Sequence, residues 1–358
     1  IFTFLCRIGV RAGMPTMWLD ELSVCYAYAS KSVAVLLRSP VSLSYLLCKF
    51  FDWIEPNDFS VRIPIVLGAL LVLVGTYATV AQFGSRFLAV ATTWVVLWHP
   101  LFVYNALQNR FYIPGLGLML VAWSCALNAY RREGTWRWLC YVAAALFAAH
   151  MWPWGSPWIG LMALWFGVCL TVRWWHSRHK SGSQSRYLVG AAALTLPVVF
   201  FGIHYLLARG VVESIGTVND SWWREPKQIS LKYLLEVLRY AYEPLASGHA
   251  DILIGLLCAG LVLATLACRW HITAFALVSL CTWFVAIYMC NRAQVDPIPR
   301  RTMFIHVNSV ILLFAGPAVL INVGHTCLRR ISSGVPPVLR LVGTVFLTIL
   351  LTCWMLWY

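Results

Sequence analysis

The sequence is short of charge and of paired cysteines. Only 11% of its 358 residues are Asp, Glu, Lys or Arg, whereas soluble domains carry about 25%. The 12 cysteines include no Cys-x-x-Cys pair, and most of them lie within apolar segments, as small hydrophobic residues do. There is also no Asp-x-Asp motif, glycine-rich phosphate loop, internal repeat or low-complexity run. These absences exclude a sizeable soluble domain and a disulfide framework, and they predict no metal site.

Long hydrophobic stretches are present instead, and 61% of the residues are hydrophobic. A stretch of about 20 apolar residues can cross a hydrocarbon layer of about 30 Å as a helix. The pattern predicts one all-α integral membrane domain over 1–358, with about eleven transmembrane helices. The first stretch is too short to span alone, so we expect the sequence to begin inside its first helix. The predicted spans are 1–13, 60–81, 86–106, 111–130, 136–150, 158–175, 187–208, 251–268, 272–290, 301–322 and 338–358.

The distribution of the net charge of +14 predicts the orientation. If the first helix starts inside, the inward loops hold twelve basic residues and one acid, Glu133, a net charge of +11. The outward segments hold the other 15 basic residues and 12 acids, a net charge of +3 over much longer loops. Because short cytoplasmic loops are enriched in Lys and Arg, this difference sets the topology and does not imply nucleic-acid binding.

Two outward segments are long enough to carry a functional site. In segment 14–59, residues 19–37 and Ser42 to Ile54 have helical apolar patterning with several aromatic residues. In segment 209–250, residues 229–243 show charged positions three or four apart. These patterns predict helices that lie in the headgroup layer rather than across the membrane.

Adjacent carboxylates, Asp20 and Glu21, follow the first predicted span at the outer membrane surface. A pair of acids beside hydrocarbon is typical of a functional site. The structural alternative is that Asp20 caps the following helix and Glu21 favours its positive end. Several cations and polar groups from distant segments are expected on the same side of the membrane, where they could bind a lipid phosphate. The alternative for each arginine is that it anchors its helix at the membrane surface. The alternative for His150 is a buried structural histidine. These residues are Arg62, Arg110, Tyr112, His150, Arg300 and Arg301.

The order of four short motifs resembles the C superfamily of membrane glycosyltransferases (GT-C). The motifs are Asp20-Glu21, Arg62-Ile63-Pro64, Arg110-Phe111-Tyr112 and Pro299-Arg300-Arg301. Within that superfamily the sequence is most similar to protein O-mannosyltransferases and to the bacterial aminoarabinose-type lipid A transferases. It departs from the family pattern at Thr302, where a tyrosine is usual, so the ligand set of the phosphate is left open.

The resemblance implies a GT-C-like fold and an inverting transfer of a sugar from polyprenyl phosphate to an acceptor hydroxyl on the non-cytoplasmic face. Asp20 would then be the base that takes the hydroxyl proton, Glu21 would position the acceptor or an arginine, and the cations would stabilise the leaving phosphate. No cofactor or metal is needed beyond the lipid-linked donor. The implied location is a bacterial inner membrane with the site facing the periplasm, and the alternative is the endoplasmic reticulum.

Two other functions remain open at this point. One is a non-catalytic subunit with a GT-C-like fold in a larger membrane assembly, because fold does not imply activity. The other is a transporter or flippase, which predicts ionisable residues at the middle of the membrane. The charges of this sequence lie mainly near the ends of the predicted helices, so they favour the transferase over the transporter.

Overall fold

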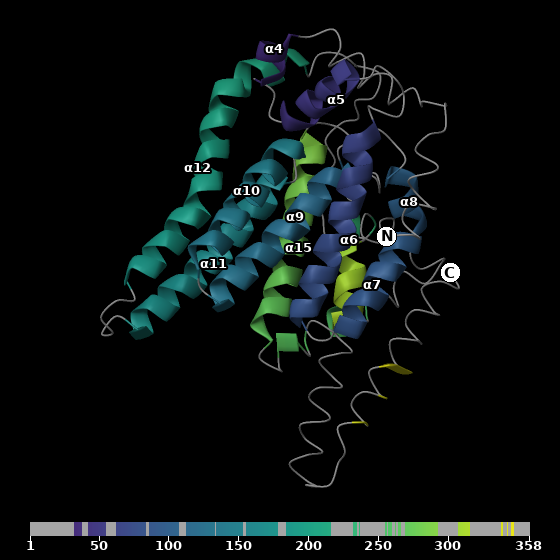
Figure 1. Ribbon diagram of the computed structural model, residues 1–358, viewed down its shortest axis with the longest axis vertical. Helices are drawn as coiled ribbons and strands as arrows, with labels where there is room; N and C mark the ends of the chain where they lie inside the picture. Colours follow the sequence, from purple (N-terminus) through teal and green to yellow (C-terminus); the bar gives the residue numbers. More distant parts are fainter. Residues whose placement is uncertain are drawn as a thin grey trace. The chain divides into compact units, whose positions relative to one another are not determined.

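The computed structural model divides the chain into two compact units, which we describe separately. Unit 1 is formed by residues 1–75 and 103–224, and unit 2 by residues 76–102 and 225–358. Every element assigned within the described residues is helical (Figure 1). The structure describes residues 32–37, 42–54, 62–83, 86–106, 112–132, 134–152, 155–177, 184–215, 232–234, 236, 255, 257–259, 262, 264–265, 269–292, 307–315, 338, 342 and 345–346.

Unit 1 is a set of long helices with two short helices at one end. The long helices α9, α10, α11 and α12 follow one another along the chain, and α10 packs against α9, α11 and α12. The α9–α10 connection turns at Gly134, whose φ of 149° favours glycine. The helices of unit 1 are α4 (Val33–Leu37), α5 (Ser42–Ile54), the first part of α6 (Ile63–Phe83), α9 (Tyr112–Arg132), α10 (Thr135–Met151), α11 (Gly155–Ser177) and α12 (Gln184–Ile215).

Helices α6 and α9 run parallel and approach each other closely through glycines. A Cβ added at Gly68 would lie 2.5 Å from Pro114, and one at Gly75 would lie 2.6 Å from the Cβ of Leu120. The contact positions advance together along both helices, so both begin at the same end of unit 1. Because lipid provides no hydrophobic driving force between helices, such small residues allow the close backbone packing that stabilises them in a membrane.

Unit 2 contains the last part of α6, α7 (Arg86–Trp98), the start of α8 (Pro100–Ala106) and α15 (Trp270–Arg292). The ring of Phe83 lies 5.6 Å from the rings of His271 and Phe275, so the end of α6 packs against the start of α15. In the described helical segment 307–315, Asn308 donates a hydrogen bond of 3.0 Å to the Ser279 hydroxyl of α15. Both groups are buried, and this bond joins the two segments.

Six of the predicted spans each correspond to one described helix, namely α6, α9, α10, α11, α12 and α15. Within the described part of the chain, five helices are long and apolar enough to cross a membrane, so the chain is an integral membrane protein. The predicted span 86–106 is two helices instead, separated at His99, because Pro100 begins α8 and has no backbone N–H to continue α7. Helix α10 has 17 residues and α12 extends past its predicted end to Ile215. The other predicted spans lie wholly or largely outside the described residues, so the number eleven stays a prediction.

The expected interfacial helix at Ser42 to Ile54 is present with those bounds as α5. It contacts α4 and α10 and lies crosswise at the end of unit 1 in Figure 1. Its last residues are exposed apolar side chains: Trp53 is 80% exposed. Of the expected helix over 19–37, the structure describes Val33–Leu37, and of that over 229–243 it describes four helical residues.

Candidate functional site

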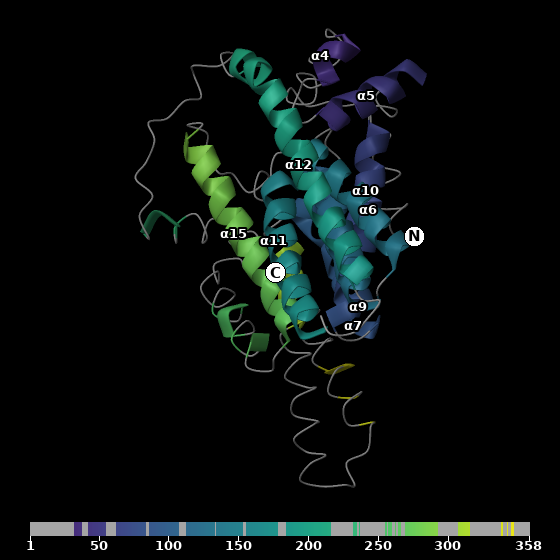
Figure 2. The same cartoon turned by 90° about the vertical axis from the view of Figure 1, so that its left-hand side faces the viewer.

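One end of unit 1 carries the candidate site, and we call it the α4–α5 end. It is the end at which α6, α9 and α11 begin, and α4 and α5 lie there (Figures 1 and 2). Each of those three helices has a proline within its first three residues, namely Pro64, Pro114 and Pro157. The first turn of a helix leaves its N–H groups unbonded, so proline is tolerated there. The sequence thus specifies where these helices begin.

Arg62 immediately precedes α6 and is only 4% exposed. Its guanidinium adds a full charge next to the positive end of the α6 dipole, and the parallel helix α9 brings a second positive end to the same side. The arrangement is therefore suited to a bound anion such as a phosphate.

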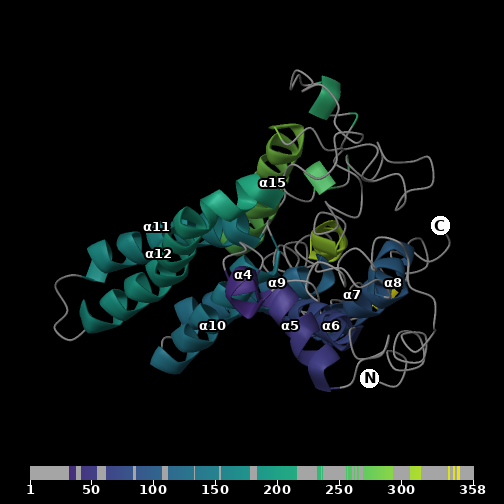
Figure 3. The same ribbon diagram turned by 90° about the horizontal axis from the view of Figure 1, so that it is seen from above.

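Tyr112 and the end of α10 lie next to each other. The ring centroids of Tyr112, the first residue of α9, and Trp152 are 5.8 Å apart in an edge-to-face contact. Trp152 is 1% exposed and fits against Gly115, where a larger residue would collide with it. Since Trp152 is two residues after His150, this contact brings Tyr112 and His150 to the same end of unit 1 as Arg62. Figure 3 shows α4 and α5 at this end, close to α9 and α10.

His150 is paired with a second histidine, His204 of α12. Their Nδ1 atoms are 3.1 Å apart, and Nε2 of His204 is 2.8 Å from the carbonyl oxygen of Leu37, the last residue of α4. Because a carbonyl only accepts, Nε2 of His204 donates, and the Nδ1 of a neutral His204 then accepts from the Nδ1–H of His150. The rings of Phe200 and Phe201 lie 5.8 Å and 5.5 Å from that of His150.

This pairing limits what His150 can do chemically. With both hydrogen bonds intact, Nε2 of a neutral His150 is the remaining acceptor of the pair. The side chain is about 9% exposed. His150 therefore has a structural role in joining α10 to α12, and it keeps one nitrogen that could contact a phosphate.

Three of the predicted site residues, Arg62, Tyr112 and His150, thus lie at the same end of unit 1. The other five predicted residues lie outside the described part of the chain: Asp20, Glu21, Arg110, Arg300 and Arg301. His204 was not among the predicted residues. The signal that could have found it is a histidine within an apolar predicted span, because ionisable residues in such spans are usually functional or paired.

No metal site accompanies this cluster within the described residues. No group of three or more His, Cys, Asp or Glu side chains there is arranged to hold a metal ion. The six cysteines whose side chains the structure describes form no disulfide. A cavity of about 950 Å³ lies elsewhere in unit 1, between α11 and α12, and contains none of the predicted site residues.

No protein-family model matches this sequence, and no curated protein is similar to it. Among solved structures, the chain is similar to the crystal structure of ArnT from Cupriavidus metallidurans in the apo state. The two are 16% identical, with a TM-score of 0.47, over 77% of this chain and 48% of that one. The chain thus spans about half the length of that protein.

Proposed function

We propose that this protein is a GT-C-like membrane glycosyltransferase. It transfers a sugar from a polyprenyl-phosphate donor to an acceptor hydroxyl at the α4–α5 end of unit 1. The observation that supports this proposal most strongly is the buried Arg62 beside the N-terminal ends of α6 and α9. That positive charge is preorganised where a leaving phosphate would need it.

In the proposed reaction, the carboxylate of Asp20 takes the proton of the acceptor hydroxyl as its oxygen attacks the anomeric carbon. A glycosidic C–O bond forms, and the bond between the anomeric carbon and the phosphate oxygen breaks on the opposite side, so the configuration inverts. The electron pair leaves on the phosphate. A phosphate monoester has a second pKa of about 6, so it departs without a general acid. One carboxylate therefore suffices, whereas glycoside hydrolysis usually needs two.

The remaining residues stabilise the leaving group and orient the acceptor. Arg62, together with Arg110, Arg300 and Arg301, would bind the phosphate oxygens through charge-assisted hydrogen bonds. Tyr112 and Nε2 of His150 could each add one hydrogen bond to the same group. Glu21 would hold the acceptor or one of the arginines. No metal is required in this scheme because arginines supply the positive charge.

The proposed site faces away from the cytoplasm, and the favoured membrane is a bacterial inner membrane with the site on the periplasmic side. The support comes from the charges at the opposite end of unit 1, where α9 and α11 end and α10 and α12 begin. Among the described residues, that end carries five arginines and no carboxylate, as expected for a cytoplasmic surface. These residues are Arg131, Arg132, Arg137, Arg173 and Arg186.

The test is substitution of Asp20 in the full chain, reconstituted in vesicles of bacterial lipid with polyprenyl-phosphate mannose or polyprenyl-phosphate aminoarabinose. Mass spectrometry measures the release of polyprenyl phosphate. We expect Asp20→Asn to lower the initial rate about 10²- to 10⁴-fold, because the base is lost. The control Asp52→Asn removes a carboxylate from α5 of the same outward segment and should leave the rate near that of the wild type.

Normal turnover by a correctly folded Asp20→Asn protein would reject Asp20 as the base. The site would not be catalytic if the wild-type protein released no polyprenyl phosphate from either donor and also bound no phosphate ester at Arg62. The alternative of a non-catalytic subunit in a larger membrane assembly would then replace this proposal.

A further inference from the structure

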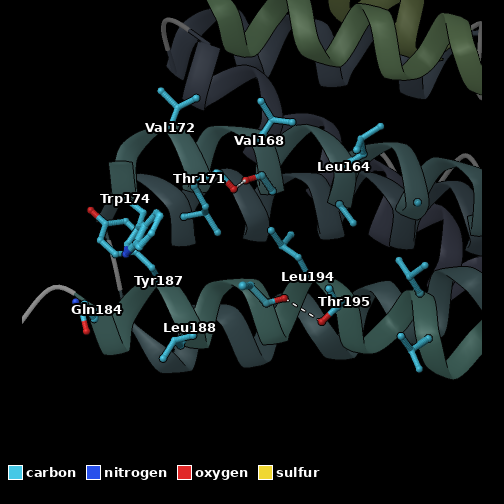
Figure 4. A pocket seen from close by; sticks show the side chains of 17 residues that line it. Leu164, Val168, Thr171, Val172, Trp174, Gln184, Tyr187, Leu188, Leu194 and Thr195 are labelled. Atoms are coloured by element: carbon cyan, nitrogen blue, oxygen red, sulfur yellow. Dashed lines mark hydrogen bonds between the residues drawn. The ribbon is translucent and has the colours of Figure 1, made fainter. Parts of the chain in front are cut away.

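A wide groove lies between α11 and α12 on unit 1, and we call it the α11–α12 groove. Its volume is about 950 Å³, within the range of about 300–1,000 Å³ that is typical of ligand sites. Gly160 and Gly167 of α11 line it, and a Cβ at either position would meet no atom within 4 Å. Leu164 and Val168 of α11 and Leu194 of α12 also line it, and Figure 4 shows the side chain of Leu194 between the two helices. The groove is therefore open space bounded by the two helices.

The walls of the groove offer almost only hydrocarbon. Its two threonine hydroxyls bond to their own helices: Thr171 donates to the Gly167 carbonyl at 2.9 Å and Thr195 to the Ala191 carbonyl at 3.0 Å (Figure 4). Such bonds to the preceding turn satisfy the hydroxyl within an apolar environment. An occupant of the groove would gain little from polar groups, and a lipid acyl chain suits it best.

A second cavity, which we call the basic cavity, adjoins one end of the groove. Its volume is about 440 Å³, and it shares the lining residues Leu170 and Tyr187 with the groove. Three arginines line it: Arg132 of α9, Arg173 of α11 and Arg186 of α12. Neither cavity has an Asp or Glu among its described lining residues. A hydrocarbon groove thus leads into a site with net positive charge.

Two side chains at the junction are held in place. Arg173 donates to the Tyr130 carbonyl at 2.9 Å, and its guanidinium carbon lies 5.7 Å from the centroid of the Tyr130 ring. The hydroxyl of Tyr187 accepts a hydrogen bond of 2.8 Å from Ser177. These contacts fix the guanidinium and the ring before any ligand binds, so less entropy is lost on binding.

The aromatic residues place the basic cavity at headgroup level. Trp174 lines the groove next to Arg173, and Trp175 is 57% exposed. Trp136, near the start of α10, is 75% exposed at the same end. Tryptophan is enriched where the hydrocarbon meets the headgroups. The arginines thus lie at the level of lipid phosphates, and the groove runs into the hydrocarbon layer.

We propose that the α11–α12 groove and the basic cavity form one binding site for an anionic phospholipid. The phosphate binds beside Arg132, Arg173 and Arg186, and an acyl chain lies in the groove. Basic pockets between transmembrane helices on the cytoplasmic side are typical sites for anionic headgroups. This site lies at the opposite end of unit 1 from the proposed catalytic site, and it does not depend on the proposed function.

The test uses the purified full chain in nanodiscs of phosphatidylcholine, titrated with phosphatidylglycerol and followed by native mass spectrometry. We expect the wild-type protein to retain phosphatidylglycerol. The variants Arg186→Gln and Arg132→Gln should each bind it with about fivefold lower affinity, which corresponds to about 1 kcal/mol per arginine. Arg131→Gln removes an exposed charge that lines neither cavity, and it should leave the affinity unchanged.

A second pair of variants tests the groove itself. Gly167→Leu should fill it and lower retention about tenfold without disturbing the fold, because the Cβ has free space. Gly202→Leu is the matched control: it lies in α12, also has nothing within 4 Å of its Cβ, and does not line the groove. We expect wild-type retention for this variant.

Three results would overturn the proposal. The first is equal retention of added phosphatidylcholine and phosphatidylglycerol, which would mean unspecific lipid contact. The second is competition by glycerol phosphate at the same concentration as the lipid, which would mean a site for the phosphate alone. The third is a photo-crosslinker at Leu188, which is 71% exposed in the groove, reacting with polypeptide instead of lipid in native membranes. If Gly167→Leu failed to fold, the crosslink at Leu188 and the titration of the wild-type protein would still decide whether the groove binds an anionic phospholipid.

Discussion

Unit 1 places arginine at both of its ends, but in opposite circumstances. At the α4–α5 end, Arg62 is 4% exposed and precedes α6, where the helix dipole repels a cation. At the other end, Arg131 and Arg132 are exposed in the last turn of α9, where the dipole attracts them. The helix dipole thus disfavours a cation at the first position and favours one at the second. Arginine thus precedes a helix at one end of unit 1 and ends a helix at the other.

The histidines of the two ends differ in the same way. His150 and His204 connect α10, α12 and the last carbonyl of α4 through hydrogen bonds between distant segments. At the other end, His176 is exposed and bonds within its own helix, to the Val172 carbonyl at 2.8 Å. The two histidines at the α4–α5 end therefore join separate helices, whereas His176 bonds only to the preceding turn of its own helix.

The largest expected difference is in catalysis. Arg62→Gln should lower the rate of polyprenyl phosphate release about 10²- to 10³-fold, which is typical when one group that stabilises the transition state is removed. Arg137→Gln removes an equal charge at the basic end and should change the rate by less than about twofold. A wild-type rate for Arg62→Gln would mean that Arg62 serves only the start of α6, and the contrast between the ends would fail.

Helix packing should be the next most sensitive property. Gly68→Ala brings a Cβ to within 2.5 Å of Pro114 and should cost about 1–3 kcal/mol of the free energy of unfolding. Gly160→Ala makes the same change where the Cβ has free space, and it should gain up to about 1 kcal/mol from helix propensity. Denaturant titration in detergent, followed by tryptophan fluorescence, measures both. Equal effects would mean that α6 and α9 can separate at no cost.

His204→Ala tests the connection to α4. Losing its hydrogen bond should cost about 1 kcal/mol, so amide exchange in Val33–Leu37 should become about fivefold faster. His176→Ala is the matched change at the basic end and should leave exchange in Val33–Leu37 as it is. Hydrogen exchange with mass spectrometry measures both variants. Unchanged exchange after His204→Ala would show that α5 alone positions α4.

The smallest expected effect is at the end of α9. Arg131→Gln removes one cation from the last turn and should lower the free energy of unfolding by about 0.3–1 kcal/mol at low salt. At about 1 M salt the Debye length falls to about 3 Å, so the difference should vanish. Denaturant titration at both salt concentrations checks this. A loss that persists at high salt would point to packing of the arginine stem instead of its charge.

The sequence by itself was sufficient for the helices. The positions of α5, α6, α9 and α15 follow from hydropathy, and those of α6 and α9 also from a proline in the first turn, which are local properties of the chain. The break at His99 was not predicted, although Pro100 marks it, because the apolar stretch continues through it. Grouping Arg62, Tyr112 and His150 at one end needed only the alternation of spanning helices, and the structure agrees with that grouping.

Only the tertiary structure decided how the helices meet. The partnership of His150 with His204, and the hydrogen bond of His204 to Leu37, depend on the register between α10, α12 and α4. The α11–α12 groove exists because the facing sides of these two apolar helices do not pack closely. The sequence does not distinguish its glycines from those that pack α6 against α9. A glycine permits close contact or open space equally well, because it has no side chain, and the choice is made by the helix opposite it.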